Sequence, residues 1–357
     1  MKTLVSIIIP FYNTPEKEYN RCIDSLKKQR FTNFEVLIID DGSSKTCLEY
    51  LEKESKNDER FRIIHKKNEG SAVAKNLGIA KANGEYVMFL DSDDALTDHC
   101  LEEAKEIVDK YHPDLVIGGV QRVTEDEIDT IIFEKEKMRR IVQVNSSRLR
   151  ELLMEHMIGL TNEYFYLQNG YIGDGPVARL VKKAIVDKAN FPKENMWSED
   201  TIWNAKMLSE CNNIVIIDDV WYKYLIYKCS QTRRFRPNCP YEFDYRTKQE
   251  VELFKTLWPN CMQGIYVRVF NDITLLCRTY LFHPDNMQSY RKKYHVYKAC
   301  IHKAIYREAL KSLDFSTEKR WINRVIKELL RFTSYYGPHC VSYCMLGVFY
   351  YLRKNKL

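Results

Sequence analysis

The sequence is poor in the features that mark exported, membrane-spanning and low-complexity proteins. No stretch approaches the roughly 20 consecutive apolar residues that a membrane-spanning helix needs. The first apolar run, residues 4–10, is too short for a signal-peptide core, and no small-residue cleavage pattern follows it. No segment repeats, and 13 glycines and 10 prolines are ordinary numbers for 357 residues. We therefore expect a globular chain that starts and stays in the cytoplasm.

Patterns that bind metals or dinucleotides are also missing. The 11 cysteines form no Cys-x-x-Cys pair, and Cys340 and Cys344 have the spacing of one helix face rather than of a zinc site. The 8 histidines form no close pair. Without an export signal, we expect reduced and partly buried thiols. No Gly-x-Gly-x-x-Gly follows the first apolar run, which argues against a dinucleotide-binding dehydrogenase.

Excess positive charge is confined to the end of the chain. The net charge is +6, but residues 289–357 hold fifteen Lys and Arg against four acids, a net +11, which leaves −5 for the rest. A basic helical region can be a solvated face that covers a catalytic domain. It can also bind peripherally to an anionic membrane surface. No recognised nucleic-acid-binding module is present, so we expect no nucleic acid partner.

Strand and helix signals alternate in the first third of the chain. β-Branched and aromatic runs predict buried strands, and polar stretches with one apolar face predict helices. The predicted strands are residues 4–9, 34–39, 61–65, 85–90 and 114–118, and the predicted helices are 15–30, 45–56, 70–82 and a segment capped by Thr97 or Asp98 that runs to 111. Pro10 is expected to end the first strand. The alternation predicts an α/β fold with a Rossmann-like, mostly parallel central sheet flanked by helices.

The signals after this region are less regular. We interpret residues 125–170 as an insertion with helices, residues 177–187 and 199–211 as helices, and residues 213–218 as another strand. Beyond Cys239 the signals are almost entirely helical, and an apolar stripe bordered by Arg and Lys runs through residues 321–332. The sequence therefore predicts a helical C-terminal extension.

Acid clusters follow two of the predicted strands. Asp40 and Asp41 follow the second strand, and Asp91-Ser92-Asp93 follows the fourth. Ligands of parallel sheets bind beyond the carboxyl ends of the strands, so we expect both clusters at one edge. An Asp-x-Asp (DXD) sequence supplies hard oxygen ligands for Mn²⁺ or Mg²⁺, and such an ion keeps positions open for substrate phosphates. The alternative is that both clusters are turns and helix caps.

Four sequence blocks occur in order within the first 95 residues. They are Val5-Ser-Ile-Ile-Ile-Pro-Phe-Tyr-Asn13, Val36-Leu-Ile-Ile-Asp-Asp-Gly-Ser-Ser44, Asn68-Glu-Gly-Ser-Ala-Val-Ala-Lys-Asn-Leu-Gly78 and Gly84-Glu-Tyr-Val-Met-Phe-Leu-Asp-Ser-Asp-Asp94. Together they resemble the nucleotide-binding half of the inverting family-2 glycosyltransferases of bacterial polysaccharide and cell-surface glycan synthesis, which have the GT-A fold. The resemblance continues more weakly to about residue 232. It implies a catalytic domain over residues 1–235, with a nucleotide-binding half at 1–95 and an acceptor half at 120–235. A helical basic region follows at residues 236–357.

The resemblance also implies roles for single residues. The nucleotide sugar would be bound by Pro10, Tyr12, Asp40, Asp41, Lys75, Asp91 and Ser92. Asp41 would bind a uracil-like base edge, supported by Asp40. Lys75 stands where the family often has Arg and would lie near the base or the diphosphate. Asp93, together with Asp91, would ligate the metal ion.

A further acid pair, Glu199-Asp200, precedes the predicted helix at residues 199–211. The family places its catalytic base in a pair of this kind, and by that match we expect Asp200 to be the base, with Glu199 as the second candidate. The alternative is that Ser198 caps the helix and the two acids complement its dipole.

The implied function is an inverting, metal-dependent transfer of one hexosyl or N-acetylhexosaminyl group. The donor would be a nucleotide-diphosphate sugar, preferably of UDP, and the acceptor a glycan or lipid-linked glycan. Residues 231–235 resemble the Gln-x-x-Arg-Trp string of processive synthases, but Phe235 replaces Trp and spanning helices are missing, so we expect single-sugar transfer.

Two rival functions remain open. The first is a catalytically silent sugar-nucleotide-binding or scaffold protein, which would bind nucleotide without turnover. The second is a nucleotidyltransferase, which would need a Gly-rich basic loop after the first strand. Residues 10–15 do not supply such a loop.

Overall fold

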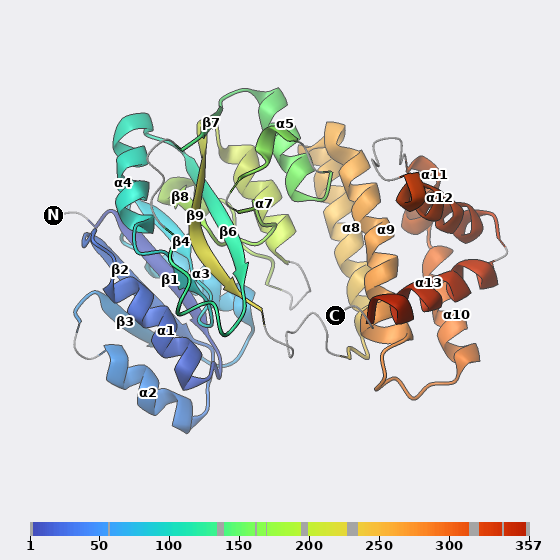
Figure 1. Ribbon diagram of the computed structural model, residues 1–357, viewed down its shortest axis with the longest axis horizontal. Coiled ribbons are helices and arrows are strands. Elements are labelled where there is room, and N and C mark those ends of the chain that lie inside the picture. Colours follow the sequence, from blue (N-terminus) through green and yellow to red (C-terminus); the bar gives the residue numbers. More distant parts are fainter. Residues whose placement is uncertain are drawn as a thin grey trace. The chain divides into compact units, whose positions relative to one another are not determined.

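The computed structural model describes residues 3–55, 58–133, 139–160, 163–168, 170–193, 199–226, 235–313, 321–337 and 339–354 (Figure 1). The chain divides into two compact units. Residues 1–157 and 161–227 form the first, here called the sheet unit, and residues 158–160 and 228–357 form the second, called the helical unit. Each unit is described by itself.

The sheet unit is built on a 9-stranded sheet of order β3-β2-β1-β4-β8-β6-β9-β5, with β7 paired to β9. The parallel strands are β1 (Val5–Phe11), β2 (Phe34–Asp40), β3 (Phe61–His65), β4 (Tyr86–Phe89), β6 (Leu115–Val123) and β9 (Ile214–Leu225). The opposite direction is taken by β5 (Ala95–Leu96), β7 (Ile141–Val144) and β8 (Arg179–Lys182). The predicted α/β fold with a mostly parallel sheet is thus confirmed.

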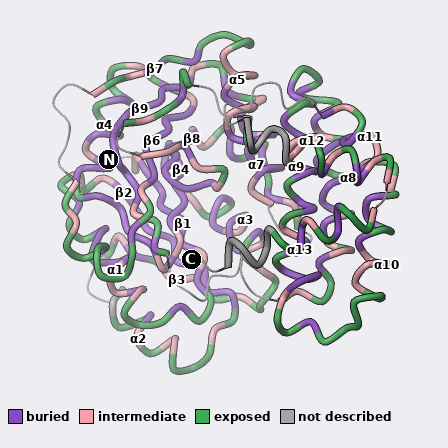
Figure 2. Tube along the Cα trace, turned by 45° about the vertical axis from the view of Figure 1, so that its right-hand side comes forward, coloured by how far each residue is buried: buried purple, intermediate pink, exposed green. Residues whose placement is uncertain are grey.

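The helices of the sheet unit mostly connect its strands. They are α1 (Glu16–Lys27), α2 (Lys45–Ser55), α3 (Ser71–Lys81), α4 (Cys100–Tyr111), α5 (Ser147–Met157), α6 (Lys183–Val186) and α7 (Glu199–Glu210). Buried residues follow the central strands of the sheet, drawn purple in Figure 2. Such continuous burial fits strands that are covered on both faces.

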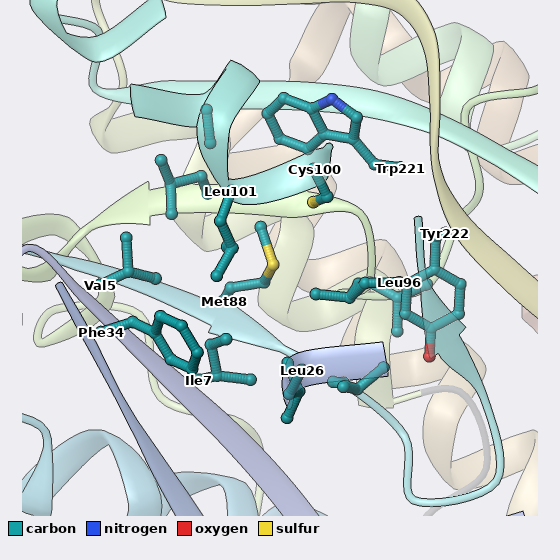
Figure 3. Packing of buried hydrophobic residues seen from close by; sticks show 14 of the residues in the cluster. Val5, Ile7, Leu26, Phe34, Met88, Leu96, Cys100, Leu101, Trp221 and Tyr222 are labelled. Carbon is teal, nitrogen blue, oxygen red and sulfur yellow. The ribbon is translucent and has the colours of Figure 1, made fainter. Parts of the chain in front are cut away.

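Helices cover both faces of the sheet. Successive residues of β1 point to opposite faces, so their side chains meet different helices. On one face, Ile7 and Ile9 belong to a core cluster with residues of α1, α4 and β9 (Figure 3). On the other face, Ile8 lies against α3 at Gly78. A Cβ atom on residue 78 would lie 2.3 Å from the Ile8 side chain. Glycine at this position therefore lets the helix approach the sheet closely.

One predicted helix is wrong. Residues 177–187 contain the strand β8 followed by a single helical turn, α6. β8 runs antiparallel between β4 and β6, and its Leu180 and Val181 are completely buried. A short apolar run suits a strand and a helix equally. Here the residues form a strand because they pair on both sides, with β4 and with β6.

Two predicted boundaries are also wrong. β1 continues through Pro10 to Phe11, and Pro10 pairs with Ile39. The main-chain carbonyl of Ile8 accepts a bond from Leu90 on the β4 side, so residue 10 faces the same side, beyond the end of β4. Proline therefore costs the ladder no hydrogen bond there. The helix α4 begins after His99, and the expected capping hydroxyl of Thr97 instead donates to the carbonyl of Val220 at 2.8 Å.

The helical unit contains α8 (Cys239–Leu257), α9 (Met262–Leu276), α10 (Tyr290–Ile301), α11 (Ala304–Ser312), α12 (Trp321–Tyr335) and α13 (His339–Lys354). The predicted helical C-terminal extension is confirmed. Arg246 of α8 forms a buried ion pair with Asp272 of α9, and Arg268 of α9 donates to Glu250 of α8 at 3.1 Å. Within the described ranges, no helix has both the length and the apolar character needed to cross a bilayer.

Candidate active site

The carboxyl ends of three neighbouring parallel strands meet at one edge of the sheet. β1 lies between β2 and β4. Phe11 at the end of β1 pairs with Asp40 at the end of β2, and Ile8 pairs with Phe89 at the end of β4. Neighbouring strands lie about 4.8 Å apart, so the segments that follow β2 and β4 are separated by about 10 Å. The structure brings both acid clusters to this edge.

Asp41 is buried, and the loop before α3 surrounds its carboxylate. One oxygen accepts the backbone N–H of Glu69 at 2.9 Å, and the other accepts that of Gly70 at 2.8 Å. The ammonium of Lys66 lies 2.5 Å from the first oxygen. Gly70 has a φ of +95°, a conformation that glycine adopts without strain. The backbone of this loop therefore fixes the orientation of Asp41.

Asp40 is also buried and supports the turn that holds Asp41. Its Oδ1 accepts the N–H of Ser43 at 3.0 Å, and its Oδ2 lies 2.9 Å from Nδ1 of His65 on β3. A carboxylate that accepts the N–H two or three residues ahead is the usual way in which Asp stabilises a turn. The turn reading of this cluster therefore describes the bonds that Asp40 makes.

The turn after β1 is tied to the turn after β2. The side chain of Asn13 accepts the N–H of Ser44 at 2.9 Å, and the N–H of Asn13 donates to the hydroxyl of Ser43 at 3.1 Å. Asn13 has a φ of +51°, which Asn tolerates better than most residues. Pro10 lies half-buried in β1, and Tyr12 is 55% exposed beside this clasp. Sequence analysis gave Asn13 no role, although it closes the first matched block.

The Asp-x-Asp segment is braced by β9. The Tyr222 hydroxyl accepts the N–H of Asp91 at 3.1 Å and donates to Asp94 at 2.8 Å. The other Asp94 oxygen accepts the N–H of Leu225 at 2.8 Å. Burial raises the pKa of Asp94 well above its ordinary range, and the charges of its neighbours Asp93 and Asp91 add to the effect. The buried Asp94 thus joins the Asp-x-Asp segment to β9, a role that the sequence did not reveal.

Ser92 connects the same loop to the segment that follows β1. Its buried hydroxyl lies 2.5 Å from that of Thr14, which follows β1. This contact joins the ends of β1 and β4 across the edge where the acid clusters lie. Ser92 therefore helps to shape the loop, and Thr14 is a partner that sequence analysis missed.

Asp91 lies in a crowded field of charge. Burial raises its pKa to about 7; Lys75 opposes this effect, whereas Asp93, Asp200 and Glu199 add to it. The acid pair at the start of α7 is therefore close enough to Asp91 to repel its charge. Asp91 and Asp93 offer carboxylate oxygens on one loop, a donor set that fits Mn²⁺ or Mg²⁺.

Lys75 of α3 connects the acid pair to the Asp-x-Asp segment. Its ammonium is buried and lies 3.2 Å from Asp200 and 3.5 Å from Glu199. Burial by itself would lower the pKa of Lys75, but the charges of Asp200, Glu199 and Asp91 outweigh it and raise that pKa. Burial also raises the pKa of Glu199, with Asp200 adding to the shift. Lys75 is therefore a fixed cation among several carboxylates.

An aromatic cluster holds the start of α7 beside β4. Trp203 of α7 stacks on Phe191 with ring centroids 4.9 Å apart, and both rings meet Phe89 edge-on at 5.5 Å and 5.4 Å. Because Phe89 is the last residue of β4, this packing brings Glu199 and Asp200 next to the Asp-x-Asp segment. Residues 194–198, including the expected cap Ser198, and residues 231–234 lie outside the described ranges.

The comparison with known proteins agrees with this geometry. Residues 6–169 match the family model described as "Glycosyl transferase family 2". Glycosyltransferase GlyG of Streptococcus pneumoniae is 27% identical over 273 residues, which are 75% of this chain and 84% of that protein. The uncharacterized glycosyltransferase EpsJ of Bacillus subtilis is 26% identical over 258 residues, 71% of this chain and 68% of that protein. Residues 6–169 of this chain form a family 2 glycosyltransferase domain.

A structural likeness extends along most of this glycosyltransferase. The crystal structure of Staphylococcus aureus TarS residues 1–349 in complex with UDP-GlcNAc has a TM-score of 0.52 and 18% sequence identity. The match covers 93% of this chain and 81% of that chain. The likeness supports the GT-A fold. In sequence, the S. aureus poly(ribitol-phosphate) beta-N-acetylglucosaminyltransferase TarS is 27% identical over 222 residues, 61% of this chain and 35% of that protein.

A tightly organised loop of the glycosyltransferase lies against the acid pair. The buried guanidinium of Arg179 donates to the carbonyls of Gly173 at 2.6 Å and Val177 at 3.2 Å. The side-chain amide of Asn204 on α7 donates to the carbonyl of Asp174 at 2.7 Å. A Cβ on Gly175 would lie 3.9 Å from Oδ2 of Asp200. The role of Arg179 was not predictable from the sequence, because its bonds go to main-chain carbonyls and leave no motif.

A cavity of about 330 Å³, lined by Gln121, Arg122 and Tyr171, belongs to the sheet unit. β6 and β9 are parallel to β4, so their carboxyl ends lie at the edge that carries the acids. Burial raises the pKa of Tyr224 on β9 to about 12, and Asp94, Asp91, Asp93 and Tyr171 contribute. The cavity therefore lies near the Asp-x-Asp segment of the glycosyltransferase.

A separate buried group contains His99, Glu103 and Asp219, whose candidate ligand atoms lie within 4.8 Å of one another. Arg139 lies 2.7 Å from Glu103, and the Trp221 indole N–H donates to Glu103 at 2.5 Å. Both oxygens of the Glu103 carboxylate are therefore already in contact with other side chains of the protein. We interpret this group as an ionic contact between α4 and β9 rather than as a metal site of the glycosyltransferase.

Proposed function

We propose that this glycosyltransferase moves one sugar, with inversion, from a nucleoside diphosphate sugar to a glycan or lipid-linked glycan acceptor in surface polysaccharide synthesis. The observation that carries the proposal is the meeting of the base-side acid Asp41, the Asp-x-Asp segment and the Glu199-Asp200 pair at one sheet edge. Inversion needs support for the departing diphosphate on one side of the sugar and a base on the other. Lys75 connects the groups that would serve these two needs.

The donor would lie across the ends of β1, β2 and β4, in the half formed by residues 1–95. Asp41, supported by Asp40, would accept a base N–H, and Pro10 and Tyr12 would line the base and ribose. Each Asp41 oxygen already accepts one backbone bond, but a carboxylate offers about four acceptor positions. UDP is the preferred nucleotide because the structurally similar TarS was crystallised with UDP-GlcNAc. The transferred group would be a hexose or an N-acetylhexosamine.

Asp93 and Asp91 would hold Mn²⁺ or Mg²⁺. Bound there, the ion would supply Lewis-acid stabilisation of the charge that develops on the diphosphate. The contact between the hydroxyls of Ser92 and Thr14 would fix the position of the loop that carries both carboxylates. Because burial raises the pKa of Asp91 to about 7, a proton would compete with the cation below neutral pH.

Asp200 would act as the base. The acceptor hydroxyl oxygen forms the bond to the anomeric carbon, the bond to the diphosphate breaks, and the hydroxyl proton passes to Asp200. The Gly175 loop lies beside Oδ2 of Asp200 and leaves no side chain there. Lys75, whose ammonium lies 3.2 Å from Asp200, would hold this carboxylate in position. Glu199 is the second candidate for this role.

The acceptor would bind on the side of β6 and β9, within the half formed by residues 120–235. The guanidinium of Arg122 lies 5.1 Å from the ring centre of Tyr171, and this pair lines the cavity with Gln121. An exposed guanidinium suits a phosphate or carboxylate on the acceptor. We predict that Arg122→Ala raises the KM for such an acceptor about tenfold, with donor hydrolysis unchanged. Steady-state kinetics with both substrates would measure this; an unchanged acceptor KM would remove Arg122 from the site.

A lipid-linked acceptor is presented at a membrane surface. The basic region at residues 236–357 would therefore place the enzyme peripherally on the cytoplasmic face of the cell membrane. Electrostatic attraction to anionic lipids is the physical basis of this part of the proposal.

One experiment tests the proposed activity. The purified protein with Mn²⁺ is screened against a panel of nucleotide sugars for release of nucleoside diphosphate, with and without lipid-linked acceptors. We expect release from at least one donor, and a loss of about 10²-fold or more in Asp93→Ala. Nucleotide binding without release from any donor would support a silent binding or scaffold protein instead. Full activity of Asp93→Ala would refute the metal role.

A further inference from the structure

The outer face of α13 is apolar and exposed. Cys340, Val341, Cys344 and Val348 are exposed, and with Met345 they line a groove of about 400 Å³. The spacing of these residues places them on one side of a helix. The sequence holds no Asp, Glu, Lys or Arg from residue 339 to residue 352. A contiguous apolar face of this kind marks a surface that something covers.

The neighbouring helix α12 carries a second exposed stripe. Leu329, Phe332 and Tyr336 have exposed fractions of 46%, 53% and 70%. They recur at the spacing of one helix face, and α12 packs on α13. Gly337, with a φ of +95°, ends α12 before α13 begins. The two helices therefore form a hairpin with large apolar side chains in solvent.

The charge around this hairpin favours one kind of partner. Residues 289–357 carry fifteen basic and four acidic residues, and the sequence of α13 ends in Arg353 and Lys354. A second copy of the chain would bring two such regions of +11 together, and their repulsion opposes that contact. An anionic membrane has an apolar interior and a negatively charged surface. It can therefore bind the apolar stripe and the basic residues at the same time.

We propose that the exposed faces of α13 and α12 dock into the interface of an anionic membrane. The side chains of Val341, Val348 and Phe332 would enter the region between headgroups and acyl chains, while the basic residues contact lipid phosphates. This inference deepens the proposed function, since it names the surface through which the enzyme reaches a lipid-linked acceptor. Its test measures lipid binding and does not depend on turnover.

The experiment compares full-length proteins by co-sedimentation with vesicles of phosphatidylcholine alone and with vesicles that also contain phosphatidylglycerol. The test variant is Val341→Glu/Val348→Glu. The control is Gln249→Glu/Asn271→Glu, which makes the same charge change at exposed positions of α8 and α9. We expect the wild type to prefer the anionic vesicles, the test variant to lose about tenfold or more in affinity, and the control to lose less than about threefold.

Several outcomes would overturn the proposal. Equal binding of wild type to both vesicle types, or unchanged binding of the test variant, would exclude docking of this face. A wild-type dimer that the test variant dissociates would identify a second copy as the occupant. A lower melting temperature of the test variant without lipid would mean that the protein itself covers the face. Release of nucleoside diphosphate without vesicles reports on the proposed activity separately, and the test variant should retain it.

Discussion

At the scale of single residues, charge decides what the site can do. Burial and neighbouring carboxylates raise the pKa values of Asp91 and Glu199. Lys75 is the buried cation that contacts Glu199 and Asp200. Groups whose pKa values are displaced by burial and by specific partners are typical of catalytic sites. Substitutions that remove a charge from this group should therefore change the rate of the reaction.

Replacing Asp200 by Asn should remove the base and leave the shape of the site unchanged. We expect kcat to fall about 10²- to 10⁴-fold, the range typical of lost general-base catalysis, with little change in donor affinity. Single-turnover transfer assays and nucleotide titration would measure the two effects. Glu199→Gln is the matched control and should cost less. If Glu199→Gln were the more damaging variant, the base would be Glu199.

Replacing Lys75 by Met should change the pH profile as well as the rate. Lys75 holds the pKa values of Asp91 and Glu199 lower than burial alone would, so its loss raises both further. We therefore expect the acid limb of the pH–rate profile to move to higher pH. Nucleoside diphosphate release measured across the pH range checks this, with the exposed Lys81→Met of the same helix as control. A profile that keeps its position would show that Lys75 does not act on these acids.

Part of this site could be predicted from the sequence, and part could not. The acids at the strand ends were predictable because a strand and the residue after it are neighbours in the chain. The brace from Tyr222 to Asp91 spans 131 residues, and that from Arg179 goes to main-chain carbonyls. Such contacts depend on how distant strands meet, and no local pattern marks them.

At the scale of helices and strands, the parallel core follows local patterns and the antiparallel strands do not. The run at residues 34–39 predicted β2 almost to the residue, because a strand buried on both faces is almost continuously apolar. The run at residues 61–65 predicted β3, an edge strand that is only partly buried. β8 was expected to be a helix, since its residues suit either state. Its neighbours β4 and β6 supply the edges on which it forms, and those neighbours lie far away in the sequence.

The contact between α4 and β9 predicts a pH dependence of folding. Burial raises the pKa of Glu103 from 4.5 to about 7; the Trp221 bond and the Arg139 charge only partly offset this. The folded state thus holds this proton more tightly than the unfolded state. The stability that it contributes is fully present below pH 4.5 and is lost as pH rises to about 7. The shift corresponds to at most about 3 kcal/mol.

Glu103→Gln should remove this dependence while keeping an oxygen that can accept the Trp221 bond. Urea unfolding at several pH values would compare it with wild type and with Asp109→Asn, an exposed position on the same helix. The difference in unfolding free energy between wild type and Glu103→Gln should vary with pH. A constant difference would mean that Glu103 is ionised in the folded protein throughout.

At the scale of the whole molecule, the chain separates its two kinds of charge. Acids gather at one edge of the sheet unit, and the basic surplus lies in residues 289–357 of the helical unit. The composition alone revealed this division. Donor, acceptor and linkage could not be predicted in this way, because they depend on the shape of the binding site, which no composition or period encodes.

Cation binding should stabilise the protein as a whole. At about 100 times its Kd, Mn²⁺ adds about 2.7 kcal/mol to the folded state, which for 357 residues corresponds to a rise in melting temperature of about 4 °C. The gain should shrink at pH values below the Asp91 pKa of about 7, because protons compete there. Calorimetric scans with and without Mn²⁺ would measure it, and Asp93→Ala should lose it. An equal rise in Asp93→Ala would place the ion elsewhere.

The brace between Tyr222 and the Asp-x-Asp loop also bears on biosynthesis. A nascent chain that has left the ribosome as far as β4 already contains β1, β2 and β3, together with Asp41 and the loop that binds its carboxylate. The bond from the N–H of Asp91 to the Tyr222 hydroxyl cannot form yet, because Tyr222 is translated 131 residues after Asp91. Half-made chains therefore already contain the groups that fix Asp41 before the bond that braces the Asp-x-Asp segment can form. That segment reaches its braced conformation only when synthesis has passed β9.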